Sequence, residues 1–581
     1  MPWGADALKT ISRRTALIGA GAITAAYGAY RLVRPGQAER ARADLTLPSG
    51  KRPNILLVLT DQERARHLIP STISLPHHDR LMANSTVFRN ASTVSNLCSM
   101  ARGIVYSGLH PQNSGLWENT PLPYSGGFRK DIPTLGTMMQ DAGYTTGYFG
   151  KWHLSHFGVD DAVGSDTIAA TFGGFGFEHT DQDRERDGAQ HGWKYDPLSA
   201  ASAANFMAEQ KGGDKPWFAA VNFVNPHDIM FFKTSEHQQK TRLNDFPDVI
   251  MPAPDDPLYA KDWGIDLPDT FGDATLEGKP PAHREMQKVM GLALGDIPLD
   301  RTDYWRDYNN YYFNCLADMD RSLGSVLDAL EATGQDKDTI VIYLADHGEM
   351  AGVHGLREKG GNIYRENQNI PFFIRHPDVP GGREIQALAS QLDVVPTLLS
   401  FAGIDGPTRE EMYPLLAGQD LSPALTATGT AVTDGPRTGT LMQWTSLIHM
   451  SEKSVRNFAA VQAASGPFAK FGAMDLREFF GGFKNRGHMR GIADGRYKFA
   501  RYFSPFEHHQ PATLADLSAR NDLELYDSLT DPAETTNLAN DLQRHGDVIL
   551  DLNSQMNALI AAEIGVDDGS YLPGPSSIWT A

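Results

Sequence analysis

The sequence predicts an α/β fold in which helices cover both faces of a large sheet. Two continuous apolar runs of strand length, residues 54–60 and 339–345, carry this prediction. Continuous rather than alternating apolarity is typical of central strands buried on both faces. Each run ends at an acidic residue, Asp61 or Asp346. Because ligands gather at the carboxyl ends of strands in open α/β sheets, we expect these carboxylates to share one metal site.

Further helix and strand patterns fill the first three quarters of the chain. The expected elements are helices at 134–143, 304–333 and 393–403, and strands at 144–149 and 217–223. The stretches 182–190 and 234–303 are polar and rich in Pro and Gly. We interpret both as long loops and insertions around the site.

The pattern changes from about residue 435 onward. Residues 489–502 predict a hairpin that turns on Asp494-Gly495, and residues 524–527 predict a short strand. A turn at 531–534 opens a terminal helical region. We therefore expect a large domain at 44–434 and a smaller antiparallel α+β subdomain with a tail at 435–581.

The N-terminus predicts a removable export signal. Arg13 and Arg14 precede an apolar run at 16–30 that is short for a membrane span and rich in Ala and Gly. Twin arginines before such a run are typical of Tat export in bacteria. Residues 41–43 offer a small-x-small cleavage site, so we assign residues 1–43 to the signal and expect a periplasmic protein without a stable membrane span. The alternative is an uncleaved anchor helix.

The composition is that of a globular protein too long for one small core, with 581 residues, 41% hydrophobic and 21% charged. The formal net charge of -19 argues against a nucleic-acid partner, whose phosphates need Lys and Arg. It does not exclude an anionic substrate, because a local basic pocket can form in an acidic protein. The two cysteines, Cys98 and Cys315, give no disulfide framework, and Cys315 lies in a helical pattern typical of a core thiol.

The surroundings of Cys98 predict a nucleophile that faces an anion. Residues 90–97 are small and polar, which suits an extended loop, and residues 103–111 fit helical turns stopped by Gly and Pro. Cys98 is therefore expected at a helix N-terminus, where backbone N–H groups and the helix dipole favour an anion. Arg102 lies one turn further on, on the same side. The alternative is a small buried thiol before a surface helix.

Residues 98–102, Cys-Ser-Met-Ala-Arg, resemble the type I sulfatase signature Cys-x-Pro-Ser/Ala-Arg. Cys98, Ala101 and Arg102 match, while Met100 replaces the proline. In that family a formylglycine-generating enzyme converts the cysteine to formylglycine, whose hydrate supplies the nucleophilic oxygen. The resemblance implies this modification at Cys98.

The resemblance to this family, within the alkaline-phosphatase-like superfamily, covers most of the chain after residue 52. Its segments are 61–62, 98–102, 150–153, 225–228, 345–348, 352–360, 494–498 and 525–532. It implies a mixed sheet sandwiched by helices in a catalytic domain at 44–434, with the antiparallel sheet in the C-terminal subdomain.

The resemblance also implies a metal site. The ligands would be Asp61, Gln62, Asp346 and His347, with residue 98 completing the shell. Oxygen-rich shells favour calcium, the ion we expect, and one imidazole shifts the site toward manganese or zinc. Many sulfatases carry Asp and Asn at the positions of Gln62 and His347. The variant here resembles phosphonate monoester hydrolases, phosphodiesterases and choline sulfatases.

Further roles follow from the same resemblance. Asp346 would take the proton of the nucleophile, His227 would protonate the leaving oxygen, and His153 would accept a proton when the second half-reaction releases the group. The remaining residues would bind the anion or the nucleophile: Lys151, Lys359 and Asn119 for the transferred group, and Arg102 for residue 98.

Two enzymatic functions remain open. One is metal-dependent hydrolysis of small aryl or alkyl sulfate esters, and the other is phosphonate monoester or phosphodiester hydrolysis on the same scaffold. Both substrate classes present a singly charged anion. A third, non-enzymatic hypothesis is a metal-binding periplasmic protein in which Cys98 is not oxidised. The tail from Glu563 to Ala581 resembles tails that pack between subunits, so we also expect a homo-oligomer.

Overall fold

The computed structural model describes residues 52–573, apart from 121, 123–124, 126, 156–163, 237, 239–249, 428–430 and 466–482. The predicted export signal at 1–43 lies outside the described residues. Among the described helices, we find none with both the length and the apolar character needed to cross a membrane.

The larger of two sheets has eight strands in the order β4-β3-β5-β1-β6-β7-β2-β8. The central strand β1 runs parallel to both β5 and β6, and β7 runs antiparallel to its neighbours β6 and β2. The sheet is therefore mixed, as predicted. Its strands are β1 (Asn54–Asp61), β2 (Thr86–Ser92), β3 (Thr145–Gly150), β4 (His179–Thr180), β5 (Trp217–Pro226), β6 (Thr339–Ala345), β7 (Phe372–Arg375) and β8 (Arg383–Ser390).

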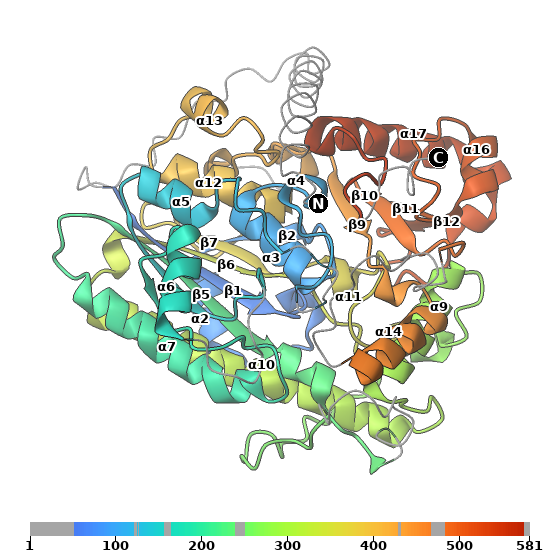
Figure 1. Cartoon of the computed structure of the whole chain (residues 1–581), viewed down its shortest axis with the longest axis horizontal. Coiled ribbons are helices and arrows are strands. Elements are labelled where there is room, and N and C mark those ends of the chain that lie inside the picture. Colours follow the sequence, from blue (N-terminus) through green and yellow to red (C-terminus); the bar gives the residue numbers. More distant parts are fainter. Residues whose placement is uncertain are drawn as a thin grey trace, which may run out of the picture.

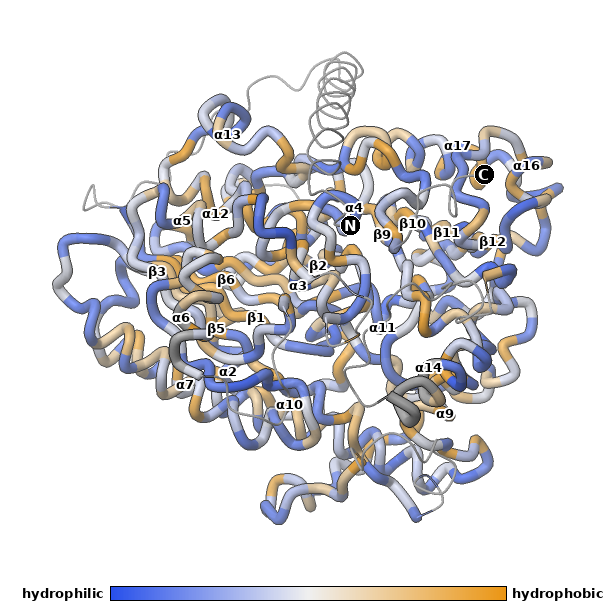
Figure 2. Tube along the Cα trace, in the orientation of Figure 1, coloured by the Kyte–Doolittle hydropathy of each residue, from blue (hydrophilic) through white to orange (hydrophobic). Residues whose placement is uncertain are grey.

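Both faces of this sheet are covered by helices (Figure 1), which confirms the reading of the two apolar runs. In β1, Ile55, Leu57 and Leu59 belong to the core on one face, and Leu56 and Val58 to the core on the other. The hydrophobic colouring of the central strands in Figure 2 follows this double burial. One face carries α3 (Cys98–Ser107), α5 (Leu135–Asp141), α6 (Ser165–Gly174) and α12 (Val394–Phe401); the other carries α2 (Pro76–Ala83), α7 (His191–Glu209) and α10 (Thr302–Ala332).

The smaller sheet is antiparallel, with the order β12-β11-β10-β9. The predicted hairpin is formed by β10 (His488–Ala493) and β11 (Tyr497–Phe503), and Gly495 adopts a φ of +95° in its turn. The outer strands are β9 (Thr440–Trp444) and β12 (Asp522–Asp527). One face packs against α17 (Leu542–Leu559). The other face shares a core with Met100 and Tyr364, and so adjoins the start of α3.

The stretch 234–303, interpreted as long loops and insertions, contains one α-helix that the sequence analysis did not expect, α9 (Pro281–Leu294). Met286, Val289, Met290 and Leu294 form its buried side at helical spacing. The other predicted helices and strands agree with the structure to within a few residues. Within the described residues, the remaining α-helices are α4 (Pro111–Ser114), α11 (Arg365–Gln368), α13 (Gly406–Met412), α14 (Glu452–Ser465) and α16 (Leu514–Arg520).

Candidate active site

Asp61 and Asp346 meet at the carboxyl ends of β1 and β6, as predicted. The two strands pair in register up to Thr60 and Ala345, so the next residue of each strand enters the same space. The backbone N–H of Gln62 donates to Oδ1 of Asp346 at 3.0 Å, and both carboxylates are fully buried. Ligand atoms of Asp61, Cys98, Asp346 and His347 all lie within 4.8 Å of one another.

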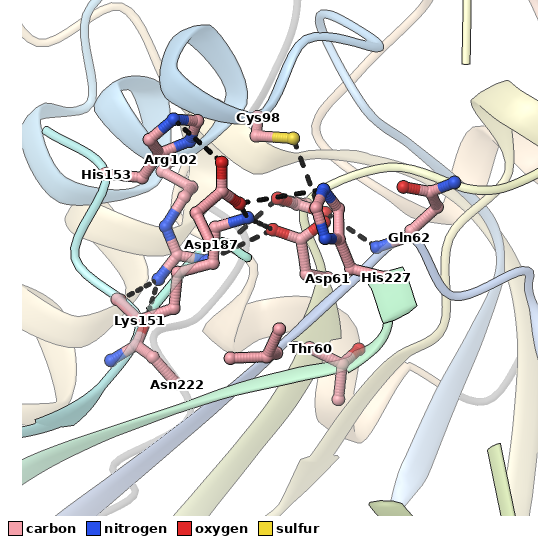
Figure 3. Close-up of polar contacts among 12 residues, drawn as sticks. Thr60, Asp61, Gln62, Cys98, Arg102, Lys151, His153, Asp187, Asn222 and His227 are labelled. Carbon is pink, nitrogen blue, oxygen red and sulfur yellow. Dashed lines mark hydrogen bonds and ion pairs between the residues drawn. The ribbon is translucent and has the colours of Figure 1, made fainter. Parts of the chain in front are cut away.

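Cys98 is the first residue of α3, which confirms its predicted place at a helix N-terminus. The residue before it, Leu97, is extended, and α3 ends at Gly108, which has a φ of +67°. The Cys98 sulfur lies 3.2 Å from Nε2 of His347 and 3.8 Å from Oδ1 of Asp61. The side chain thus points at the two strand ends (Figure 3). Burial, then the charge of Asp61, raises the pKa of the Cys98 thiol.

His347 presents an unprotonated nitrogen to this group. Its Nδ1 lies 3.0 Å from the carbonyl oxygen of Gly348, and a hydrogen bond there requires the proton on Nδ1. Burial, and then the positive charge of Lys359, lowers the pKa of His347 to about 3. Nε2 therefore carries a lone pair toward Cys98. A neutral imidazole oriented by its other nitrogen is a common metal ligand.

This donor set fits a divalent cation. Oδ2 of Asp346 is buried and has no hydrogen-bond partner among the described residues. Burial and the charge of Asp61 raise the pKa of Asp346, because two carboxylates so close together in a buried site repel each other. A cation between them would relieve this repulsion and bind the free oxygen. Carboxylate oxygens with one imidazole suit calcium or manganese.

Arg102 lies beneath the two carboxylates. Its Nε donates to the carbonyl of Trp152 at 3.1 Å, and its Nη2 donates to Oδ1 of Asn222 at 2.7 Å. Its Nη1 lies 3.9 Å from both Asp61 Oδ2 and Asp346 Oδ2. The predicted contact of Arg102 with residue 98 stays a prediction, since its hydrogen bonds run to Trp152 and Asn222 and its Nη1 faces the two carboxylates.

Asp187 joins three of the predicted site residues. It accepts a hydrogen bond from Nζ of Lys151, and its Oδ2 lies 3.3 Å from Nε2 of His153. Its Oδ1 lies 3.6 Å from Nε2 of His227. Lys151 also reaches Oδ2 of Asp61 at 2.8 Å. Figure 3 shows Asp187 in the middle of this group, which the site analysis of the sequence had missed.

Burial keeps both histidines of this group neutral. It lowers the pKa of His153 to about 3, although the charge of Asp187 opposes the shift. It also lowers the pKa of His227 well below the usual value, with Lys151 and Lys359 adding to the effect. Together with His347, the site therefore combines three neutral imidazoles with the two buried ammonium groups of Lys151 and Lys359.

Gln62 and Lys359 form the opposite side of the site. Nζ of Lys359 donates to Oε1 of Gln62 at 3.0 Å. The amide nitrogen of Gln62 donates to Glu349 at 2.5 Å and to Glu358 at 3.0 Å. Because both amide hydrogens are bound by carboxylates, the orientation of the amide is fixed. The predicted role of Gln62 as a metal ligand stays a prediction.

The Sulfatase family model matches residues 53–404, which is more than half of the chain. The chain belongs to the sulfatase family. This confirms the resemblance inferred from Cys98 and Arg102 and the predicted class of hydrolase. The match ends before the antiparallel sheet begins.

Several curated proteins are similar to this sulfatase. The uncharacterized sulfatase YidJ of Escherichia coli is 29% identical over 379 residues, which cover 61% of this chain and 69% of that protein. The N-acetylglucosamine-6-O-sulfatase of Bacteroides thetaiotaomicron is 25% identical, covering 64% and 72%. The choline-sulfatase of Rhizobium meliloti is 26% identical, covering 65% and 72%.

Solved structures share the fold of this sulfatase. A phosphonate monoester hydrolase from Silicibacter pomeroyi has a TM-score of 0.61 at 20% identity, covering 88% of this chain and 96% of that chain. A 2-O GAG sulfatase has a TM-score of 0.60 at 21% identity, covering 88% and 93%. At these identities the likeness concerns the fold alone.

Asn119 lies at the N-terminus of α3 in this sulfatase. Its Oδ1 accepts a hydrogen bond from the backbone N–H of Ser99 at 3.2 Å. Asn119 therefore lies at the helix N-terminus, the place where the sequence predicts a bound anion. Its predicted contact with substrate stays a prediction.

Three acidic residues of the sulfatase site were missed by the sequence analysis. Asp187 lies in the loop 182–190, where Asp183 and Glu185 gave several acids without a periodic pattern. Glu349 directly follows the matched segment 345–348, and Glu358 lies within the matched segment 352–360. Both accept hydrogen bonds from the side-chain amide of Gln62. A signal was available for Glu358, which directly precedes Lys359.

Proposed function

We propose that this sulfatase hydrolyses aryl or alkyl sulfate esters through a formylglycine formed from Cys98. One observation carries the proposal. Cys98 begins α3 with its side chain directed at Asp61 and His347, at the carboxyl ends of the central strands. A nucleophile in this place would face the cation site and the two buried lysines together.

The chain offers a complete donor set for one divalent cation. Asp61, Asp346 and His347 would hold the ion together with residue 98, and Gln62 is a further candidate. When bound, such an ion acts as a Lewis acid and keeps the nucleophile deprotonated. We expect calcium, with manganese as the alternative.

Proton transfer would be divided between the carboxylate and imidazole groups. Asp346 would take the proton of the attacking hydroxyl. His227 would take up a proton from solvent as the anionic substrate binds and pass it to the leaving alcohol oxygen. His153, already neutral, would receive a proton when the second hydroxyl expels the sulfate. Asp187 lies beside both imidazoles and would stabilise each in its charged form. Asp187 would thereby serve both half-reactions, through His227 in the first and through His153 in the second.

Charge on the transferred group would be stabilised by Lys151 and Lys359. Both are fixed before substrate arrives, Lys151 by Asp61 and Asp187 and Lys359 by Gln62. Preorganised cations in a buried site act without reorganisation during the reaction. Asn119 would add a further contact at the end of α3.

The alternative is phosphonate monoester or phosphodiester hydrolysis at the same site. Gln62 and His347 favour this function, because many sulfatases carry Asp and Asn at these positions and the pair found here resembles that of phosphonate monoester hydrolases. A phosphonate monoester hydrolase also shares the fold. A sulfate monoester and a phosphodiester carry the same charge, so the lysines would serve both. The two functions differ in the groups around the transferred atom.

The test is an assay of purified protein with 4-nitrophenyl sulfate and with 4-nitrophenyl phenylphosphonate. We expect a higher kcat/KM for the sulfate, and no hydrolysis of either ester by Cys98→Ala. A strong preference for the phosphonate would favour the alternative. Hydrolysis of neither ester by folded, metal-loaded protein would favour the non-enzymatic hypothesis.

Maturation and assembly belong to the same proposal. A formylglycine-generating enzyme would modify Cys98 before Tat export to the periplasm removes residues 1–43. The mass of the periplasmic protein tests removal of the signal, and recovery of Met1 would contradict it.

We also propose a homo-oligomer, which light scattering tests. Glu563, at the start of the tail, pairs with His110 and Arg437 of its own chain.

A further inference from the structure

A cavity of about 500 Å³ lies beside Lys359. Its volume is in the range of small-molecule binding sites. Its walls come from α9, from the start of α10 and from the segment 350–362, and α9 lies next to α14 below the small sheet (Figure 1). The apolar lining includes Met286, Met290, Ile297, Trp305, Met350 and Leu356.

Most polar groups of the cavity wall are already bound within the protein. The charged residues Lys288 and Glu452 line it too, and they pair with Glu285 and Arg456. Gln287 donates to the carbonyl of Gly355 at 3.1 Å, and His283 contacts the hydroxyls of Tyr502 and Tyr364 at 3.0 and 3.2 Å. Sugars need many unpaired donors and acceptors, because each buried hydroxyl without a partner is costly. These walls are better suited to an apolar ligand.

Arg357 is held in this wall by backbone carbonyl groups. Its Nη2 donates to the carbonyls of Met290, at 3.1 Å, and Gly295. Its Nη1 is buried without a hydrogen-bond partner among the described residues. This nitrogen lies behind the cavity surface, so Arg357 presents no open donor to a ligand.

Lys359 connects the cavity to the reacting centre. Its side chain lines the cavity, and its Nζ binds Oε1 of Gln62, the residue after Asp61. A sulfate group held by Lys359 would therefore lie next to the cavity. We propose that the cavity receives the alcohol part of the ester, so that the substrates are sulfates of apolar alcohols, alkyl chains or simple aryl groups, rather than sulfated sugars. This inference rests on the proposed function.

Chain length gives the first test. Burying a methylene is worth a factor of about three to four in kcat/KM. We expect kcat/KM to rise by about this factor for each carbon from ethyl to hexyl sulfate, and glucosamine 6-sulfate to be a poor substrate. Equal values for ethyl and hexyl sulfate, or a preference for the sugar sulfate, would overturn the proposal.

A glycine on α9 permits a sharper test. Gly291 lines the cavity, and a Cβ there would meet no atom closer than 3.5 Å, at Asp296 Oδ1. Gly291→Leu should therefore fill the cavity without disturbing the helix. Gly173 on α6 has no atom within 4 Å of such a Cβ, so Gly173→Leu is the matched control.

We expect Gly291→Leu to lower kcat/KM for hexyl sulfate at least 10-fold, and to change that for ethyl sulfate less than about twofold, since the shorter chain buries less apolar area. Gly173→Leu should leave both values unchanged. An equal loss for both esters in Gly291→Leu, or no loss for hexyl sulfate, would contradict the assignment.

A binding measurement separates this inference from the proposed function. Octanesulfonate cannot be hydrolysed, so its affinity by calorimetry does not depend on turnover. We expect it to bind the wild type more tightly than ethanesulfonate does, and to lose this advantage in Gly291→Leu. If Gly291→Leu loses this advantage and the wild type hydrolyses no ester, the cavity assignment stands and the proposed function is overturned. Equal affinity of the two sulfonates for the wild type would overturn the cavity assignment even if sulfate esters are hydrolysed.

Discussion

The sulfur of Cys98 lies 3.2 Å from Nε2 of His347, the nitrogen that carries no proton. The hydrogen bond from Nδ1 to Gly348 fixes the ring, so the lone pair of His347 and the side chain of Cys98 converge on one point. Asp61 and Asp346 reach the same point from the strand ends. Four donors from three segments thus surround a space suited to one cation.

Metal removal should lower stability as well as activity. Treatment with EDTA would leave the Asp61 and Asp346 carboxylates facing each other without a cation. At an ion concentration of about 100 times Kd, bound metal adds about 2.7 kcal/mol to the free energy of unfolding. We expect the thermal midpoint to fall with EDTA and to recover with calcium. In Asp346→Asn the EDTA effect should be much smaller, and an unchanged wild-type midpoint would argue against the site.

Asp187→Asn should reduce turnover strongly. The change keeps the size of the side chain but removes the charge that holds Lys151, His153 and His227 together. Misplacement of such groups can cost about 10²-fold, and we expect a fall in kcat of this order. Asp183→Asn, in the same loop but with a half-exposed carboxylate, is the control and should retain activity. Equal activities of the two variants would contradict the role of Asp187.

Gln62→Glu should destabilise the fold. Burial, then the charge of Glu349, raises the pKa of Glu358 to about 7, so these carboxylates already repel each other. A third carboxylate in place of the amide removes two hydrogen-bond donors, and we expect the free energy of unfolding to fall by about 1–3 kcal/mol. Adding Glu358→Gln restores a donor and should recover part of this loss in urea titrations. A single variant as stable as the wild type would show that the network does not hold Gln62.

Stability should fall as pH rises, because of His78. The ring lies 3.0 Å from Glu63 and 2.5 Å from Asp320. Burial alone would lower the pKa of His78, but these carboxylates outweigh it and raise the pKa to about 9. Since the unfolded value is about 6.5, the contribution is fully present below that pH and is lost as pH rises through 9, by about 3 kcal/mol in total. Urea titrations at about pH 6 and pH 10 should show a smaller difference for His78→Gln than for the wild type. Equal differences would contradict this role.

The sequence predicted the centre of the site well because strand ends are strong local signals. Asp61 and Asp346 each follow a continuous apolar run, and adjacent strands must end at the same edge of the sheet. Cys98 was placed by the turn residues on both sides of it. In each case the pattern along the chain determines the position in space.

The rest of the site depends on contacts that leave no local pattern. Asp187 is one of several acids in a polar loop, and only its packing against Lys151 and His153 distinguishes it. Helix α9 was missed for a different reason. Met286, Val289 and Met290 have helical spacing, but the many Pro and Gly residues around them outweighed that signal. The cavity that α9 lines could not be predicted without this helix.

The chemical state of residue 98 decides whether a formylglycine performs the hydrolysis. The measurement is the mass of the tryptic peptide that ends at Arg102, taken on the same preparation whose sulfate ester hydrolysis is assayed. We expect the active protein to carry an aldehyde in place of the CH₂SH group, and activity to rise with the fraction converted. Full activity in a preparation that contains only unmodified Cys98 would contradict this expectation.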